Sequence, residues 1–202
     1  MSKIKDLFDG DRLNLERIEF VLVDDNQTVL DIMGHILTGF GVRTSHKFQT
    51  VKEAKALLNR TTVDFVLVDG HMPDEDGFEL LRWLRRESTN SNRYVPAVLV
   101  TGDTNDSTVR RARDVGANFL VAKPLSPSVL LQRIFWIARS DRLFIECDSY
   151  SGPDRRFKRS GPPVGTNGRR ADDLSGQLGN ATEPNLSQDE INALMKPAKV
   201  VL

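Results

Sequence analysis

The chain has 202 residues with 28 basic and 28 acidic side chains, so its formal net charge is zero. This balance gives no overall attraction to nucleic acid or to an anionic membrane. The single cysteine, Cys147, cannot form an intrachain disulfide, and a reducing, intracellular environment is the simplest interpretation. Because no apolar run reaches about 18 residues and no signal-peptide pattern opens the chain, we expect a cytoplasmic protein without a membrane span.

The composition changes near residue 140 and divides the chain into four predicted regions. Residues 1–17 form an N-terminal extension, and residues 18–140 form one domain of ordinary size. Residues 141–185 are rich in Gly, Pro and Arg and lack aliphatic periodicity, so we expect a largely disordered linker. Residues 186–196 carry an amphipathic pattern and predict a short docking helix.

Short apolar runs alternate with helical patterns throughout the predicted domain. The runs lie at 20–23, 42–45, 63–68, 95–100 and 118–122. Most are almost continuously apolar, which suits strands that are buried on both faces of a parallel sheet. Helical spacing between them, clearest from Val29 to Phe40, completes the alternation. This pattern predicts a doubly wound α/β fold with helices on both faces of the sheet.

Polar side chains follow four of the predicted strands. The first run ends in Asp24 and Asp25, the third in Asp69 and the fourth in Thr101, and Lys123 follows the fifth. Ligands of open parallel sheets bind at the carboxyl ends of the strands, so we expect these groups on one rim. Acidic oxygens suit Mg²⁺, and a carboxylate can attack phosphorus as a nucleophile. A hydroxyl and an ammonium group can bind the phosphoryl oxygens.

Each of these groups also has a simpler interpretation. Asp24 and Asp25 could cap a helix, Asp69 could belong to a turn, and Lys123-Pro124 could begin the last helix. Their joint occurrence at four strand ends favours phosphoryl transfer over these separate explanations.

Four segments of the predicted domain resemble the CheY-like receiver family of response regulators, in the order that the family has. They are VLVDDN (21–26), VLVDGHMPDEDG (66–77), VLVTGDT (98–104) and GANFLVAKP (116–124). The resemblance covers about residues 19–139. It implies a flavodoxin-like, five-stranded parallel sheet of strand order 2-1-3-4-5.

The resemblance also implies a function in two-component signalling. Asp69 corresponds to the phosphoacceptor, which would become 4-aspartylphosphate on transfer from a histidine kinase or phosphotransfer protein. Thr101 and Lys123 correspond to the switch hydroxyl and the phosphate-binding lysine. The implied Mg²⁺ ligands are Asp24, Asp25, Asp69 and the backbone carbonyl of His71. We therefore expect no enzyme activity beyond self-catalysed phosphorylation and dephosphorylation.

One position departs from the family pattern. Receivers often have an aromatic residue three positions before the lysine, where this chain has Leu120, with Phe119 one residue earlier. Neighbouring residues of a strand face opposite sides of a sheet, so we do not expect Phe119 to act as the aromatic switch.

The predicted linker carries an arginine-rich stretch that could contact anions, and its candidate residues are Arg155, Arg156 and Arg159. The spacing of Arg155 and Arg159 resembles that of cyclic-di-GMP receptors, which leaves a nucleotide-responsive adaptor as an alternative function. A solvated linker explains the same residues more simply.

The sequence LSQDEINALM (186–195) predicts a capped amphipathic helix. Ser187 and Glu190 have capping-box spacing, and the apolar stripe comprises Ile191, Leu194 and Met195. The segment resembles the N-terminal CheY-binding peptide of the flagellar switch protein FliM, which implies a role in chemotaxis or motility. We expect it to dock on the face formed by the fourth helix, fifth strand and fifth helix of a receiver, either in this chain or in another. A DNA-binding output domain is not expected.

Overall fold

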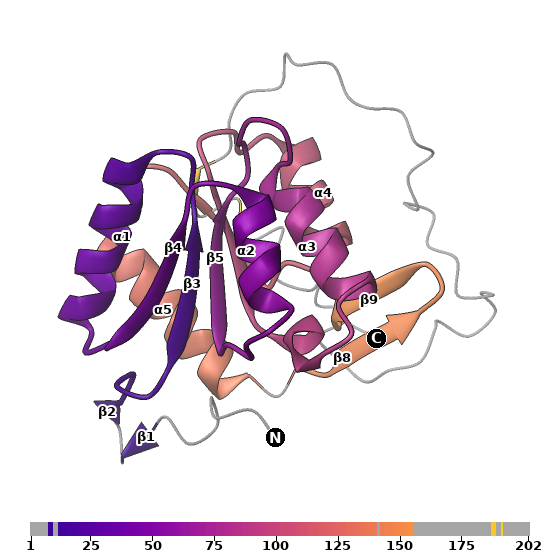
Figure 1. The fold of residues 1–202 in the computed structure, drawn as a ribbon. Coiled ribbons are helices and arrows are strands. Elements are labelled where there is room, and N and C mark those ends of the chain that lie inside the picture. Colours follow the sequence, from indigo (N-terminus) through magenta and orange to yellow (C-terminus); the bar gives the residue numbers. More distant parts are fainter. Residues whose placement is uncertain (1–7, 10–11, 141, 156–186, 189–190, 192–202) are drawn as a thin grey trace.

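The structure, a computed structural model, describes residues 8–9, 12–140, 142–155, 187–188 and 191. Its centre is a five-stranded parallel sheet with the strand order β4-β3-β5-β6-β7 (Figure 1). Two very short strands, β1 (Phe8–Asp9) and β2 (Arg12–Leu13), pair with each other ahead of this sheet. Counted within the sheet, the order is 2-1-3-4-5, which confirms the predicted flavodoxin-like fold.

The strands of the sheet are β3 (Glu19–Val23), β4 (Thr44–Phe48), β5 (Phe65–Asp69), β6 (Ala97–Thr101) and β7 (Phe119–Ala122). The helices are α1 (Gln27–Gly39), α2 (Val51–Leu58), α3 (Gly77–Arg86), the 3₁₀ helix η2 (Ser91–Tyr94), α4 (Asp106–Asp114) and α5 (Pro127–Arg139). The second strand lies at Thr44–Phe48, whereas the apolar pattern predicts 42–45. The reason is that β4 is an edge strand of partly exposed residues, so no apolar run marks it.

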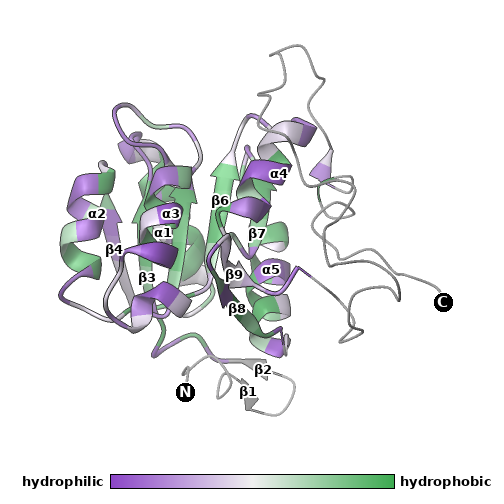
Figure 2. Cartoon of the chain, turned by 90° about the vertical axis from the view of Figure 1, so that its right-hand side faces the viewer, coloured by the Kyte–Doolittle hydropathy of each residue, from purple (hydrophilic) through white to green (hydrophobic). Residues whose placement is uncertain are grey.

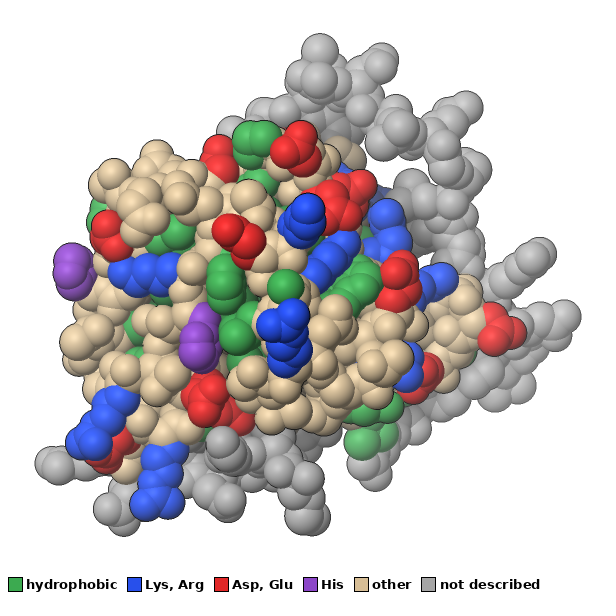
Figure 3. Space-filling model, in the orientation of Figure 1, with side chains coloured by type: hydrophobic (Ala, Val, Ile, Leu, Met, Phe, Trp, Pro, Cys, Tyr) green, Lys and Arg blue, Asp and Glu red, His purple; other side chains and the backbone are tan. Residues whose placement is uncertain are grey.

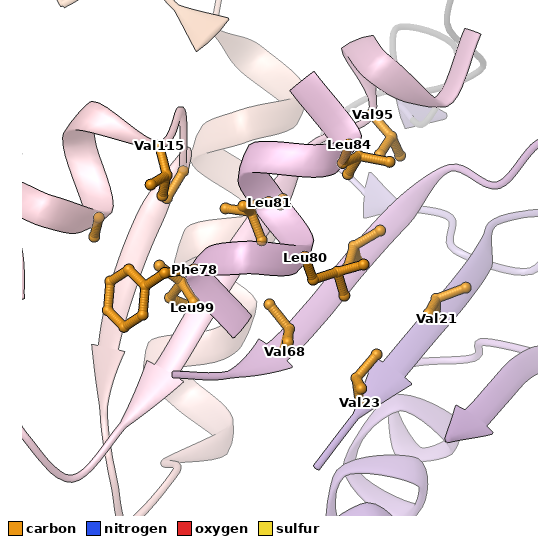
Figure 4. Close-up of a cluster of buried hydrophobic side chains, with 14 of the residues drawn as sticks. Val21, Val23, Val68, Phe78, Leu80, Leu81, Leu84, Val95, Leu99 and Val115 are labelled. Atoms are coloured by element: carbon orange, nitrogen blue, oxygen red, sulfur yellow. The ribbon is translucent and has the colours of Figure 1, made fainter. Parts of the chain in front are cut away.

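The sheet separates two apolar cores. Helices α2, α3 and α4 cover one face, and α1 and α5 cover the other. Figure 4 shows Phe78 and Leu81 of α3 in the first core with Val68 and Leu99 of the sheet. The hydropathy colouring of Figure 2 shows apolar strands between helices that carry polar surfaces. No helix in the described part of the chain is long and apolar enough to cross a membrane.

An antiparallel hairpin follows α5, formed by β8 (Phe144–Cys147) and β9 (Tyr150–Pro153). It lies within the range 141–185 that the sequence assigns to a linker, so that linker cannot begin at residue 141. The hairpin packs on α3: Ser151 Oγ donates a hydrogen bond of 2.9 Å to the carbonyl of Arg85, and Arg85 lies 5.4 Å from the ring of Phe144. The hairpin is ordered by these contacts with distant residues, which no local periodicity reveals.

Candidate functional site

Three carboxylates converge where β3 and β5 end. Oxygens of Asp24, Asp25 and Asp69 lie within 4.8 Å of one another. Asp24 is completely buried and Asp25 is exposed. The backbone N–H of Asn26 donates a 3.0 Å hydrogen bond to Asp24 Oδ1 and so fixes this carboxylate at the start of α1. The pairing of β3 with β5 thus brings together acidic residues that are separated by more than 40 positions.

Lys123 joins two of these carboxylates. Its Nζ atom lies 2.8 Å from Asp24 Oδ2 and 2.9 Å from Asp69 Oδ2. Burial opposes the charge of the ammonium group, but hydrogen bonds and charge attraction from both carboxylates outweigh it and raise the pKa of Lys123. The lysine precedes Pro124 in a cis peptide bond. Because β7 ends immediately before it, Lys123 reaches the same rim as the carboxylates.

Burial raises the pKa of Asp69, although hydrogen bonds from Lys123 and from the backbone N–H of His71 work in the opposite direction. The His71 bond to Asp69 Oδ1 measures 3.3 Å. This hydrogen bond keeps the His71 backbone beside the Asp69 carboxylate, as expected for a residue whose carbonyl would help to bind a cation. Asp69 therefore lies in a confined polar pocket in which its ionisation depends on nearby positive charge.

Thr101 ends β6 and is completely buried. Its Oγ1 atom lies 3.0 Å from His71 Nδ1 and accepts a 3.2 Å hydrogen bond from the backbone N–H of Asp103. The His71 Nε2 atom lies 3.9 Å from Asp103 Oδ2. The hydroxyl therefore already contacts two loops that border the pocket, and a new acceptor at Asp69 would compete with His71 Nδ1 for the hydroxyl proton.

The loop after β5 reaches α3 by close packing. Asp76 caps α3 and forms a capping box with Glu79, which defines where the helix begins. A Cβ atom added to Gly77 would lie 2.0 Å from the carbonyl oxygen of Asp69, so only glycine fits between this helix and the strand end. A Cβ atom at Gly102, in the loop after Thr101, would meet no atom within 4 Å.

The donor set of the pocket fits Mg²⁺. Carboxylate oxygens are the ligands that this hard cation prefers, and three of them already lie together beside the His71 backbone. The residues that would hold the ion are Asp24, Asp25, Asp69 and His71.

Phe119 and Leu120 lie on opposite faces of the sheet. Leu120 belongs to the core beneath α3 and α4, and Phe119 belongs to the core beneath α5. The Phe119 ring packs edge-on against Trp136 at 4.9 Å. The aromatic ring is therefore directed away from the α4 side, as expected from strand alternation.

Two arginines on or beside α4, Arg111 and Arg155, each have an acidic and an aromatic partner. Arg155 lies 2.6 Å from Asp114 and 3.9 Å above the ring of Tyr150. Arg111 lies 2.8 Å from Asp76. The space-filling view shows basic and acidic side chains interleaved over one face of the molecule (Figure 3). Arg155 thus binds within the domain, while Arg156 and Arg159 lie outside the described residues.

Of the predicted docking helix, the structure describes Ser187, Gln188 and Ile191. Ile191 is completely buried in the core that contains Leu120. Gln188 bonds to the backbone of β7, at Leu120 and Ala122. Sequence reasoning missed Gln188, because a glutamine beside a capping serine gives no signal of a distant backbone partner. Leu194 and Met195 lie outside the described residues.

Comparison with known proteins identifies the family of the domain. Residues 20–135, more than half of the chain, match the response regulator receiver domain family. The chain is 28% identical to the sensory/regulatory protein RpfC of Xanthomonas campestris over 65% of its length, but it spans only 18% of that relative. It is 26% identical to the chemotaxis protein CheY of Pseudomonas aeruginosa, over 58% of this chain and 93% of that protein.

Solved structures show the same fold. The CheY-like receiver domain protein of Methanospirillum hungatei superimposes with a TM-score of 0.54 at 25% identity, covering 60% of this chain and 93% of that one. The chain belongs to the response regulator receiver domain family. Its membership places it among proteins of two-component signalling.

Proposed function

We propose that this protein is a phosphoacceptor response regulator that takes a phosphoryl group on Asp69. The observation that carries the proposal is the bridge that Lys123 forms between Asp24 and Asp69 in a pocket that also contains Asp25 and is bordered by Thr101. A positive charge beside the nucleophile and further acidic oxygens around it suit transfer of a phosphoryl group to a carboxylate.

The donor is a phosphohistidine of a histidine kinase or phosphotransfer protein. A carboxylate oxygen of Asp69 attacks phosphorus, the new O–P bond forms, and the P–N bond breaks. The imidazole leaves with the bonding electron pair and takes up a proton from solvent. Lys123 remains beside Asp69, where its ammonium group holds a phosphoryl oxygen by charge and hydrogen bonding.

Mg²⁺ bound by Asp24, Asp25, Asp69 and the His71 carbonyl would neutralise the charge that carboxylates and phosphoryl oxygens bring together. The protein's own part is to orient these groups before transfer. The Asn26 N–H bond to Asp24 and the His71 N–H bond to Asp69 supply that orientation.

Thr101 is the residue that responds to the phosphoryl group on Asp69. Its hydroxyl exchanges His71 Nδ1 for a phosphoryl oxygen, which moves the end of β6 and the loop at Asp103 toward the pocket. The output is a change in protein contacts on the α4–β7–α5 face. Similarity to the chemotaxis protein CheY supports a target in motility.

Labelling with acetyl phosphate tests the assignment. Asp69→Asn should abolish the label, because an amide nitrogen cannot form the acyl phosphate. The matched control is Asp64→Asn, because Asp64 lies just before the other end of β5. Its carboxylate accepts a hydrogen bond from the backbone N–H of Glu19. A stable label on Asp69→Asn would overturn the proposal, as would equal loss in both variants while circular dichroism shows both to be folded.

A further inference from the structure

The outer edge of β7 presents backbone groups that the central sheet does not use. In the described part of the chain, β7 is the last strand of its sheet. The backbone N–H of Lys123 donates inward to the carbonyl of Thr101 at 2.8 Å. Alternate residues of a parallel strand bond to the same neighbour, so the N–H and C=O groups of Leu120 and Ala122 face outward. Such an edge is a template for further pairing.

Gln188 occupies this edge. Its Oε1 atom accepts a 2.9 Å hydrogen bond from the Ala122 N–H, and its Nε2 atom donates a 3.4 Å bond to the Leu120 carbonyl. One carboxamide therefore offers the edge the same acceptor and donor that a peptide group of an added strand would offer.

Ile191 fixes the same segment from another direction. Its side chain is completely buried in the core that contains Leu120, Val109 and Ala112. Its N–H donates to the Ser187 carbonyl at 3.0 Å, a hydrogen bond with the spacing of an α-helix. Residues three apart share a helix face, so Gln188 and Ile191 reach the strand edge and the apolar core from the same side.

We propose that the C-terminal segment is an intrachain ligand of the β7 edge through Gln188 and Ile191. The segment covers the outward-facing backbone of Leu120 and Ala122 and fills the adjoining core with Ile191. The docked segment thereby blocks this edge against other proteins. The partner that it excludes is an amphipathic helix with an amide side chain and an aliphatic side chain three residues apart, which would make the same two contacts. The receiver has to release its own segment before such a partner can bind.

The position of Ala122 couples this edge to the Asp69 pocket. Ala122 pairs in register with Thr101 and directly precedes Lys123. Gln188 lies on the side of β7 that is opposite to β6. Movement of Thr101 and Lys123 toward Asp69 therefore draws the Ala122 N–H away from Gln188. This coupling, unlike the docking itself, rests on the proposed function and predicts that a phosphoryl group on Asp69 weakens docking.

Amide hydrogen exchange of the full chain tests the docking. Gln188→Ala and Ile191→Ser should each make the Ala122 amide exchange about tenfold faster or more, because the local opening that exposes it becomes easier. The matched controls on α1 are Gln27→Ala, an exposed glutamine, and Ile32→Ser, a half-exposed isoleucine. Equal Ala122 exchange in all variants would overturn the proposal. Protection that rises with protein concentration would also overturn it, since the segment would then come from a second copy.

A synthetic peptide of residues 184–197 tests the exclusion of partners. It should shift the Leu120 and Ala122 amide signals of the Ile191→Ser chain and bind the wild-type chain at least about tenfold more weakly, because the wild-type segment competes from within the chain. Equal binding to both chains, or binding to neither, would overturn the proposal that this edge is an occupied docking site.

Beryllofluoride with Mg²⁺, used as a phosphoryl analogue, separates coupling from function. If the coupling is correct, beryllofluoride accelerates hydrogen exchange of the Ala122 amide in the wild-type chain. It also binds the Gln188→Ala chain more tightly than the wild-type chain by the same factor, because coupling between two ligands is reciprocal. Equal affinity for both chains would overturn the coupling and leave the docking intact. Absence of binding to either chain would contradict the proposed function and, with it, the coupling, while the exchange results would still decide the docking.

Discussion

Charged side chains hold the Asp69 pocket together, whereas a neutral amide and an aliphatic side chain cover the outer edge of β7. The two regions lie on one strand, since Lys123 directly follows the residue that Gln188 contacts. The pocket gathers residues that lie at the end of a strand or in the first two positions after it. The edge is built from backbone groups and from residues more than 60 positions away. The comparison teaches that chemistry at strand ends can be found in sequence motifs, while occupancy of a strand edge depends on tertiary contacts.

Removal of Lys123 should have the largest effect and challenges the view that charge holds the pocket. Lys123→Ala leaves the buried Asp24 without its cation, so we expect a loss of about 2–4 kcal/mol in unfolding free energy without Mg²⁺. Urea denaturation measures it. The control, Lys47→Ala, breaks an exposed pair with Asp31 and should change stability by less than about 1 kcal/mol. Equal effects of the two changes would contradict a charge-held pocket.

A pair of glycines tests the steric side of the same pocket. Gly77→Ala should cost about 1–3 kcal/mol, because its Cβ would overlap the Asp69 carbonyl and force α3 away from the strand end. Gly102→Ala has open space and should be nearly silent in the same thermal unfolding experiment. If Gly77→Ala were as stable as the wild type, the close approach of α3 to β5 would be wrong.

Tyr150→Phe should have the smallest effect and examines the hairpin after α5. The Tyr150 hydroxyl donates a 2.7 Å bond to the Pro153 carbonyl, so we expect a loss of about 1 kcal/mol. The control, Tyr94→Phe, removes the hydroxyl of a half-exposed tyrosine and should lie within about 0.5 kcal/mol of the wild type.

The same tyrosine gives a pH dependence with a defined sign. Burial raises the pKa of Tyr150 above its ordinary value of 10.0. The stability that the neutral phenol contributes is therefore complete below pH 10 and is lost as the pH rises through the raised pKa. The chain has two tyrosines, so an absorbance titration of Tyr94→Phe reports Tyr150 alone. A midpoint at or below that of free tyrosine would contradict the burial.

The sequence predicts the fold and the convergence of the pocket well because both depend on local signals. Buried strands are apolar runs, and the ends of these strands place Asp24, Asp69 and Thr101. Their assigned roles in catalysis and metal binding stay predictions. The edge strand β4 was displaced in the prediction because its residues are partly exposed and polar.

The regions beyond α5 were harder to predict for a physical reason. The hairpin is ordered through Arg85, a buried arginine whose pKa burial lowers to about 10, so that it still carries its charge at neutral pH. Arg85 donates hydrogen bonds to the carbonyls of Arg93 and Gly116, while its own carbonyl accepts from Ser151. Gly and Pro residues suggested a linker here, but the contacts that order the segment come from α3 and from the turn after α4.

The hairpin also determines where the chain leaves the domain. It carries the backbone from the end of α5, on one face of the sheet, to Arg155, whose guanidinium binds Asp114 at the end of α4. This is the face on which Ile191 is buried. When two sites are joined by a connecting segment, the effective concentration of one at the other falls if the distance between them exceeds the average end-to-end length of that segment. The hairpin therefore determines the distance that the connecting segment has to span before Gln188 and Ile191 can dock. Detaching the hairpin from α3 would lower the local concentration of these two residues at the β7 edge without altering any residue that docks.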